Sequence, residues 1–200
     1  MQTPLPDTPP QPPMNRRRWL AWTLASVALG ASGVAAWRQF GPRQAPVPTS
    51  INKVPERWWT HAFAQPGQDS TRTLQSFRGQ PLLINLWATW CPPCIEEMPL
   101  LDAFYRQNAA KGWQTVGIAV DKPEAVERFL QRTPVQFPVL LAGSRLGMEL
   151  AADLGNTARG LPFSLLLDAR GQPLEAHTGQ LDLPRLLKWH QRAFSRNTHS

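Results

Sequence analysis

Short apolar runs alternate with amphipathic stretches from residue 56 to residue 197, and this alternation predicts strands and helices in turn. Pro81–Trp87 and Gln114–Val120 are almost continuously apolar, as expected for strands that are buried on both faces of a sheet. Shorter strands are predicted at Phe137–Leu141, Phe163–Leu167 and Pro173–His177, and a leading hairpin at Trp58–Ala64 and Thr71–Phe77 around the turn-rich QPGQDS.

The predicted helices lie between these strands and after the last of them. In Pro123–Gln131, Val126 and Phe129 recur at the spacing of one helical face, and Leu183–Phe194 is likewise amphipathic. Further helices are predicted at 93–110 and 145–153, and a turn at 169–172. Strands that alternate with helices, followed by a terminal hairpin and helix, indicate an α/β sandwich around a central mixed sheet.

A different pattern precedes this domain. Six prolines among the first fifteen residues predict an extended, solvated tail, which leads into arginines 16, 17 and 18. The next nineteen residues, Trp19–Trp37, hold no charge. As a helix they would rise about 28 Å, close to the thickness of a bilayer's hydrocarbon core. We therefore expect a cytoplasmic tail at 1–18, a transmembrane signal anchor at 19–37 and a proline-rich linker at 38–55.

Three export interpretations of residues 19–37 stay open. Besides an uncleaved anchor, Val34–Ala36 fits the small-residue cleavage site of a signal peptide, and Arg17-Arg18 fits a twin-arginine signal. The arginines favour a cytoplasmic N-terminus. Each interpretation places residues 56–197 in the periplasm, either as part of a single-pass inner-membrane protein or as a soluble protein after cleavage.

The charge of the chain follows this division. The first 44 residues hold five arginines against one aspartate, so +4 of the formal net charge of +7 lies there. No basic run interleaved with aromatic residues follows, which argues against nucleic-acid binding. Two cysteines in 200 residues exclude a disulfide-stapled scaffold.

Both cysteines belong to Trp90-Cys91-Pro92-Pro93-Cys94, which follows a predicted buried strand and begins a predicted helix. A helix N-terminus presents unpaired N–H groups and the positive end of the helix dipole, and both stabilise a thiolate. Cys91, at the helix mouth, is therefore the candidate nucleophile. Cys94, one turn inward, is the candidate resolving thiol. Pro92 and Pro93 suit the first helical turn, where a missing N–H costs nothing.

Other chemistries of a C-x-x-C pair lead to an alternative function. Zinc is disfavoured because the sequence has neither a second cysteine pair nor two histidines at metal-ligand spacing. A purely structural disulfide would close a very short loop and stabilise little. Two soft thiolates can bind Cu(I), so an exported Cu(I) carrier stands as the alternative to a thiol–disulfide oxidoreductase.

The segment LLINLWATWCPPCIEEMPLL, with its W-C-P-P-C-x-x-E-x-P spacing, resembles the active-site region of the thioredoxin superfamily. More narrowly, it resembles the membrane-anchored TlpA/ResA-like disulfide reductases of bacteria over roughly residues 56–197. VDKPE at 120–124 and FPVLL at 137–141 resemble that family's insert, and GLPFS at 160–164 matches its cis-proline segment. The resemblance implies a thioredoxin-like three-layer sandwich with a central mixed β-sheet, an N-terminal β-hairpin extension and an α/β insert.

The resemblance also implies roles for single residues. Pro162 would be a cis-proline facing the Cys91–Cys94 pair, which leaves the backbone of Leu161 free to pair with an extended substrate strand. Glu97 stands at the offset of an acid that acts near the cysteines in that family. Buried beside a thiolate, Glu97 should have a raised pKa and could shuttle a proton to or from Cys94.

Two further positions near the motif complete the expected site. Asn85 stands where thioredoxin has a buried aspartate, and because an amide takes up no proton, that acceptor is missing here. Trp90 is expected to form a partly exposed substrate-binding surface beside Cys91.

We expect the pair to reduce protein disulfides. Pro92 and Pro93 add neither charge nor donor to the thiolate, so the expected reduction potential is below roughly −200 mV, nearer thioredoxin than a strong oxidant. The resemblance implies a membrane thiol relay of the DsbD/CcdA type as electron donor and a client such as apocytochrome c. A general protein-thiol or copper-site reductase role is equally compatible with these residues. We expect a monomer, with no cofactor and no metal.

Overall fold

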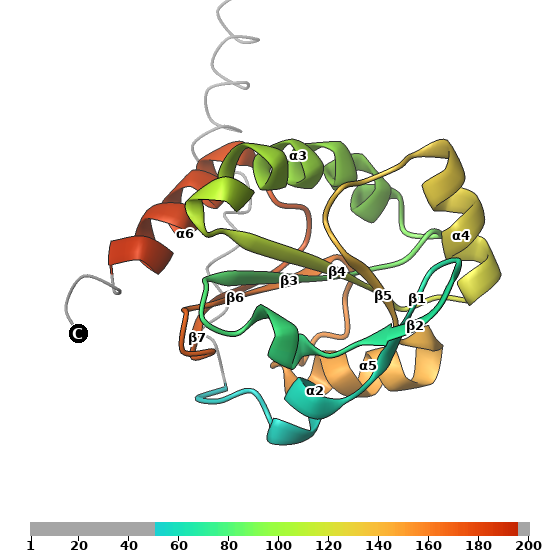
Figure 1. Cartoon of the computed structure of the whole chain (residues 1–200), viewed down its shortest axis with the longest axis horizontal. Coiled ribbons are helices and arrows are strands. Elements are labelled where there is room, and N and C mark those ends of the chain that lie inside the picture. The colour runs from blue at the N-terminus through green and yellow to red at the C-terminus, as the bar shows by residue number, and fades with distance from the viewer. Residues whose placement is uncertain (1–50, 196–200) are drawn as a thin grey trace, which may run out of the picture. The chain divides into compact units, whose positions relative to one another are not determined.

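The computed structural model describes residues 51–195 (Figure 1). The expectations for segments 1–18 and 19–37, and for most of the linker at 38–55, lie outside the described residues. Across residues 51–195, no helix combines the length and the apolar character needed to cross a membrane. The helices are α2 (Glu56–Thr60), α3 (Pro92–Asn108), α4 (Pro123–Arg132), α5 (Gly143–Asp153) and α6 (Leu183–Ser195), with short 3₁₀ helices η1 (Leu74–Phe77) and η2 (Ala109–Lys111). The strands are β1 (Phe63–Gln65), β2 (Gln68–Arg72), β3 (Leu82–Trp87), β4 (Gln114–Ala119), β5 (Val139–Leu141), β6 (Phe163–Leu167) and β7 (Pro173–Thr178).

The strands of the described chain form one mixed sheet in the order β2-β1-β5-β4-β3-β6-β7. The β3–β4 and β4–β5 pairs are parallel, whereas β6 pairs antiparallel with both β3 and β7. Helices α3 and α6 cover one face of the sheet, and α2 and α5 cover the other (Figure 1). The predicted three-layer sandwich with a central mixed sheet is therefore confirmed.

Strand β3 is an interior strand, between β4 and β6, and its side chains are divided between two apolar cores. Its even-numbered residues pack in the core that contains α2 and α5, while Leu83 and Trp87 pack in the core beneath α3 and α6. This division follows from the period of two in a strand, and burial on both faces explains why the run is almost wholly apolar. Asn85, the one amide side chain of the strand, is fully buried.

An α/β segment lies between β4 and α5, as the resemblance implied. Helix α4 buries Val126 and Phe129 on the face predicted from their spacing. Strand β5 continues the parallel part of the sheet, where Leu140 lies opposite Ile118. The insert therefore extends the sheet beyond β4 towards the β1–β2 hairpin.

The leading hairpin is present, but its predicted bounds were wrong. Residues 56–60 form α2, which lets the adjacent Trp58 and Trp59 pack in the same core, whereas a strand would direct them to opposite faces. Residues 74–77 form η1 instead of the end of a strand. The hairpin itself joins β1 to β2, so Gln68 to Ser70, which were expected in the turn, belong to a strand.

Gly171 lies in the predicted turn between β6 and β7, at a φ of +79°, and a Cβ placed on it would lie 2.7 Å from Cζ2 of Trp59. Gly171→Ala should therefore lower the free energy of unfolding by about 2–4 kcal/mol, through left-handed backbone strain and overpacking together. Gly67→Ala is the matched control, because Gly67 has a φ of +65° and open space around its Cβ position. Urea titration should show a smaller loss for the control; equal losses would refute overpacking against Trp59.

Candidate active site

The cysteine motif follows the C-terminal end of strand β3. After β3 ends at Trp87, a short loop leads to Cys91, which is the N-cap of α3, and Pro92 and Pro93 occupy the first helical turn as predicted. Cys94 is the first residue of the turn with an N–H group, and that group donates to the carbonyl of Cys91 at 3.0 Å.

The N-terminus of α3 has few donors left for a thiolate. The N–H of Cys91 donates to the carbonyl of Ala88 at 3.2 Å, and the two prolines have no N–H. The N–H groups of Cys94 and Ile95 both donate to the carbonyl of Cys91. Any stabilisation of a Cys91 thiolate by this helix therefore comes from the dipole as a whole, with little from direct N–H donation.

Cys91 and Cys94 form a disulfide, with their Cα atoms 5.3 Å apart. The two cysteines differ in exposure, since Cys91 is 5% exposed and Cys94 is 0% exposed. Trp90, directly before Cys91, is 64% exposed and is the most exposed large hydrophobic residue of the described chain. An attacking or attacked group from solvent therefore meets Cys91 and Trp90 before it meets Cys94.

Pro162 directly precedes β6 and lies at the same end of the sheet as the cysteine motif. The Leu161–Pro162 peptide bond is cis, as the resemblance implied. Because Leu86 lies opposite Phe163, the antiparallel register places Pro162 beside the end of β3, where the motif loop begins. Within residues 51–195, the backbone of Leu161 makes no hydrogen bond, whereas the carbonyl of Pro162 accepts one from the N–H of Gly179 at 2.8 Å.

Glu97 lies in α3, one turn after Cys94, and its side chain is 0% exposed. Its Oε1 accepts a hydrogen bond from Nδ2 of Asn85, and its Oε2 accepts one from the N–H of Leu181, each at 2.8 Å. Burial raises the pKa of Glu97 to about 7, and the two hydrogen bonds oppose this shift by favouring the carboxylate. The buried acid with a raised pKa that was predicted at this position is therefore present.

The sequence reasoning missed two of the groups around Glu97. Ser164 lies opposite Asn85 in the β3–β6 ladder, and its Oγ accepts a second hydrogen bond from Nδ2 of Asn85 at 3.0 Å. Leu181 comes from the loop before α6. Both are far from Glu97 in the chain and have no distinctive local pattern, so only the register of β3 with β6 could have pointed to Ser164.

Asp121 is a further residue whose role was missed, and it holds the loop that carries Trp90. Its Oδ2 accepts hydrogen bonds from the N–H and the hydroxyl of Thr89, at 2.9 and 2.5 Å. Its Oδ1 accepts a third from the N–H of Lys122 at 2.7 Å. Asp121 therefore ties the motif loop to the start of the insert.

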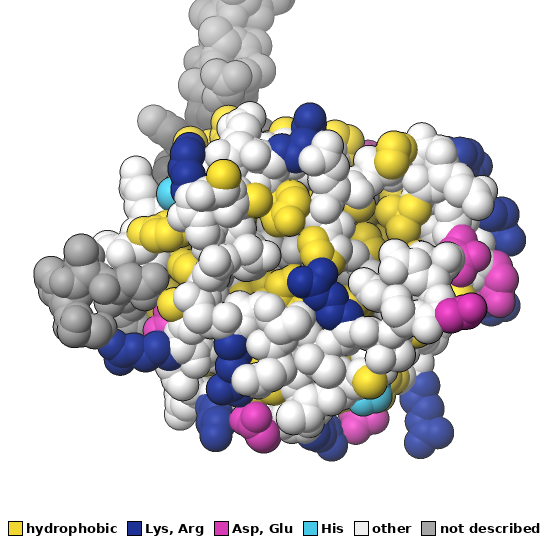
Figure 2. Space-filling view, viewed as in Figure 1, with side chains coloured by type: hydrophobic (Ala, Val, Ile, Leu, Met, Phe, Trp, Pro, Cys, Tyr) yellow, Lys and Arg dark blue, Asp and Glu magenta, His cyan; other side chains and the backbone are white. Residues whose placement is uncertain are grey.

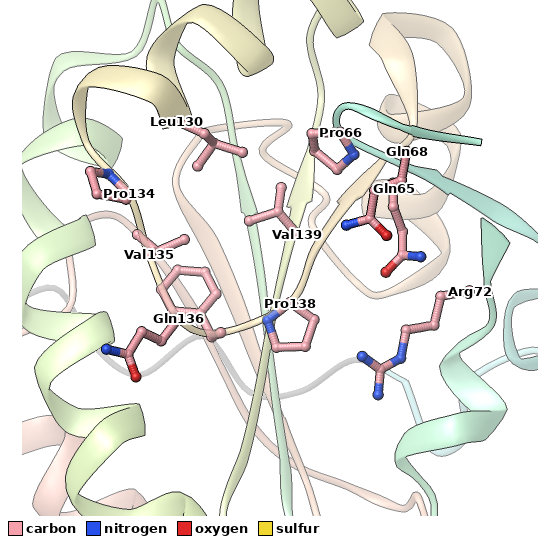
Figure 3. Close-up of a pocket in the computed structure, with 11 residues that line it drawn as sticks. Gln65, Pro66, Gln68, Arg72, Leu130, Pro134, Val135, Gln136, Pro138 and Val139 are labelled. Carbon is pink, nitrogen blue, oxygen red and sulfur yellow. The ribbon is translucent and has the colours of Figure 1, made fainter. Parts of the chain in front are cut away.

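A separate pocket of about 320 Å³ lies between the β1–β2 hairpin and the segment before β5 (Figure 3). Its lining mixes proline and valine with the polar side chains of Gln65, Gln68, Arg72 and Gln136. None of the residues around the disulfide lines it. On the face shown in Figure 2, lysine and arginine side chains lie scattered and form no continuous basic patch.

The sulfurs of Cys91 and Cys94 are the candidate ligands for a soft metal when the pair is reduced. Elsewhere in the described part of the chain, no three His, Cys, Asp or Glu side chains gather at a spacing that would hold a metal ion.

Sequence comparisons match this architecture. The chain is 30% identical over 107 residues to the thiol-disulfide oxidoreductase ResA of Halalkalibacterium halodurans, a match that covers 53% of this chain and 58% of that protein. ResA of Bacillus cereus is 31% identical over 110 residues, covering 54% of this chain and 60% of that protein. The chain thus spans less than two thirds of the length of these curated relatives.

Solved structures match a larger share of the chain. A thioredoxin-related protein from Neisseria meningitidis serogroup B superposes with a TM-score of 0.60 and 30% identity, covering 66% of this chain and 98% of that one. The resemblance to TlpA/ResA-like proteins that the motif indicates is confirmed by these relatives and by the thioredoxin-like fold. Residues 51–186, more than half of the chain, match the model of the Redoxin family, and the chain therefore belongs to that family.

Proposed function

We propose that this chain is a thiol–disulfide oxidoreductase that reduces protein disulfides. The proposal rests on one arrangement of residues: a cysteine pair at the start of α3, with the buried Glu97 one helical turn after Cys94. Because the pKa of Glu97 is about 7, this residue can both take up and release a proton at physiological pH. The relatives named thiol-disulfide oxidoreductase support the same activity.

The reaction would begin with the reduced pair. The Cys91 thiolate attacks one sulfur of a client disulfide, which forms a mixed disulfide and releases the other client sulfur as a thiolate. Glu97, as a carboxylate, takes the proton of the Cys94 thiol. The Cys94 thiolate then attacks Sγ of Cys91, which closes the Cys91–Cys94 disulfide and releases the second client thiolate. The pair loses two electrons, and the client disulfide gains them. The two client thiolates take up two protons from solvent, which replace the one that Cys91 lost when its thiolate formed and the one that Glu97 releases after taking it from Cys94.

Client binding would use the groups around the exposed end of the disulfide. The unpaired backbone of Leu161, held by the cis Pro162, offers one N–H and one C=O to an extended client segment. Trp90 offers an exposed aromatic face beside the reacting sulfur.

The scarcity of N–H donors at the start of α3 supports the reductive direction. A strongly oxidising pair needs a heavily stabilised thiolate, and here the two prolines supply no donor. We therefore expect a reduction potential below roughly −200 mV, and a value above roughly −150 mV would reverse the direction.

The surroundings of the enzyme are part of the proposal. Residues 56–197 would act as a monomeric catalytic domain in the periplasm, held at the inner membrane by residues 19–37 or released by cleavage. A DsbD/CcdA-type relay would return electrons to Cys91 and Cys94, and apocytochrome c or another extracytoplasmic thiol protein would be the client. A protease-protection assay on spheroplasts tests the location.

An insulin-reduction assay, run beside a Cu(I) titration of the reduced full chain, tests the activity against the alternative. The oxidoreductase should turn over insulin disulfides with a thiol donor. Tight Cu(I) binding without insulin turnover would identify a Cu(I) carrier instead.

Trp90→Ala should raise the KM for a protein disulfide several-fold and leave kcat nearly unchanged, because an exposed aromatic contributes binding more than chemistry. Its free energy of unfolding should stay within about 0.5 kcal/mol of wild type, since the side chain is 64% exposed. Leu187→Ala is the matched control, an exposed large hydrophobic residue on α6. An equal rise in KM in both variants would remove the specific role of Trp90.

A further inference from the structure

Only one end of the side-chain amide of Asn85 has hydrogen-bond partners. Nδ2 donates to both Oε1 of Glu97 at 2.8 Å and Oγ of Ser164 at 3.0 Å. The other end of the same amide, Oδ1, is buried and has no hydrogen-bond partner. A buried acceptor without a partner costs about 1–3 kcal/mol. In this orientation the two hydrogen bonds that Nδ2 donates must offset that cost.

This orientation suits only one protonation state of Glu97. Both oxygens of Glu97 accept a hydrogen bond, from Asn85 and from Leu181, which matches an acceptor-only carboxylate. A protonated Glu97 would carry an O–H group that needs an acceptor. Oδ1 of Asn85 is the unpartnered buried acceptor on the residue that already contacts Glu97.

Reversal of the amide resolves the mismatch. Because nitrogen and oxygen of an amide are nearly the same size, a half-turn about the last side-chain bond exchanges their positions without moving other atoms. Oδ1 would then accept hydrogen bonds from the O–H of Glu97 and from the hydroxyl of Ser164. The Ser164 hydroxyl accepts in one state and donates in the other, so it serves both.

We propose that Asn85 is a positioning residue whose amide reverses when Glu97 gains or loses its proton, so that both states of the acid keep a hydrogen bond. The proposal rests on the proposed function, in which Glu97 takes the proton of Cys94. A fully buried acid would otherwise lose a hydrogen bond in one of its two states. The reversal keeps that bond, and Nδ2 then takes the position in which Oδ1 has no partner in the described chain.

Of the groups around Glu97, Asn85 is the one that can bond the acid in both of its protonation states. Glu97 contacts Asn85 from strand β3 and the N–H of Leu181 from the loop before α6, and Asn85 in turn contacts Ser164 on β6. Cys94, which is in the disulfide, lies one turn before Glu97 on α3. No charged side chain shifts the pKa of Glu97, because burial and the two hydrogen bonds account for it. His177, opposite Ser164 on β7, has its pKa lowered by burial, which favours its neutral form.

Neutron diffraction from deuterium-exchanged crystals of the oxidised full chain, at about pH 5 and about pH 9, tests the reversal directly. The ND₂ group of Asn85 should face Glu97 at the higher pH, and Oδ1 should face it at the lower pH. Asn156 is the internal control, since its Oδ1 is also buried and unpartnered but its Nδ2 donates to the carbonyl of Gly160, which does not titrate. The ND₂ group of Asn85 facing Glu97 at both pH values would overturn the proposal.

Asn85→Leu gives a second readout in solution. Because a reversing amide bonds Glu97 in both protonation states, its loss should move the midpoint of the Glu97 titration, followed by carboxyl carbon NMR, and of the pH–rate profile by much less than about one unit. A rise of about one unit or more in a folded variant would show that Asn85 only donates to the carboxylate and would overturn the reversal. Reversal of the amide in a protein that fails to reduce insulin would support this inference and refute the reductase.

Discussion

Cys91→Ala should abolish insulin reduction, with a loss of at least about 10³-fold, because no other described side chain offers a thiolate to solvent. Cys94 is fully buried, so it cannot replace Cys91 as the attacking sulfur without local opening. Cys94→Ala should also stop turnover, but for a different reason. It leaves the attack intact and removes the thiol that resolves the mixed disulfide, so the client should stay bound to Cys91.

Mass spectrometry of the adducts that each variant retains separates these roles. The Cys94→Ala variant should retain clients through Cys91, and the Cys91→Ala, Cys94→Ala double variant should retain none. Thermal unfolding of each variant serves as the control for folding. If the Cys91→Ala variant instead retained clients through Cys94, the assignment of attacking and resolving sulfurs would be inverted.

Glu97→Gln should change both stability and exchange. In the oxidised protein the pKa of Glu97 is raised to about 7 from 4.5, so the folded state binds the proton more tightly than the unfolded state does. The stabilisation from the protonated acid is therefore complete below pH 4.5 and is lost as the pH rises through 7. The free energy of unfolding of the variant, relative to that of wild type, should therefore increase between pH 4.5 and pH 8. The expected increase is at most roughly 3 kcal/mol.

The same change should slow disulfide exchange by an order of magnitude or more at pH 7, because glutamine cannot accept the proton of Cys94. Glu96→Gln is the matched control, since Glu96 is its exposed neighbour on α3 and should alter neither property. Urea titrations at both pH values and stopped-flow exchange kinetics measure the two effects. Equal pH dependence of stability in wild type and Glu97→Gln would show that Glu97 does not titrate near neutrality, and unchanged exchange rates would retire the proton shuttle.

The predicted elements succeed where the apolar pattern is unambiguous. The bounds of β3 and β4 were predicted to within one residue and those of β6 without error. Mostly apolar runs of five to seven residues are too short for typical helices and fit strands buried on both faces. The failure at α2 has the same origin. Two adjacent buried tryptophans have no periodicity, so a five-residue helix and a short strand have the same local pattern.

The site divides along a similar line. Cys91, Cys94 and Glu97 lie within seven residues on one loop and helix, so their spacing alone places them together. The cis bond before Pro162 was expected from a resemblance, since spacing by itself favours an ordinary trans proline. Asp121 was noticed only as part of the insert, because its contact with Thr89 depends on the ends of β3 and β4 lying side by side.

The helices, the strands and the cysteine motif could be predicted from the sequence, because helix and strand periods, proline positions and a helix-capping cysteine act over a few neighbouring residues. The pKa of Glu97 could not be predicted in that way. Its burial needs α3 packed on the sheet, and its two hydrogen bonds come from Asn85 on β3 and from Leu181, which is 84 positions away. Ser164 joins them only through the pairing of β3 with β6. Desolvation and hydrogen bonding set a pKa, and both depend on which distant segments the folded chain brings into contact.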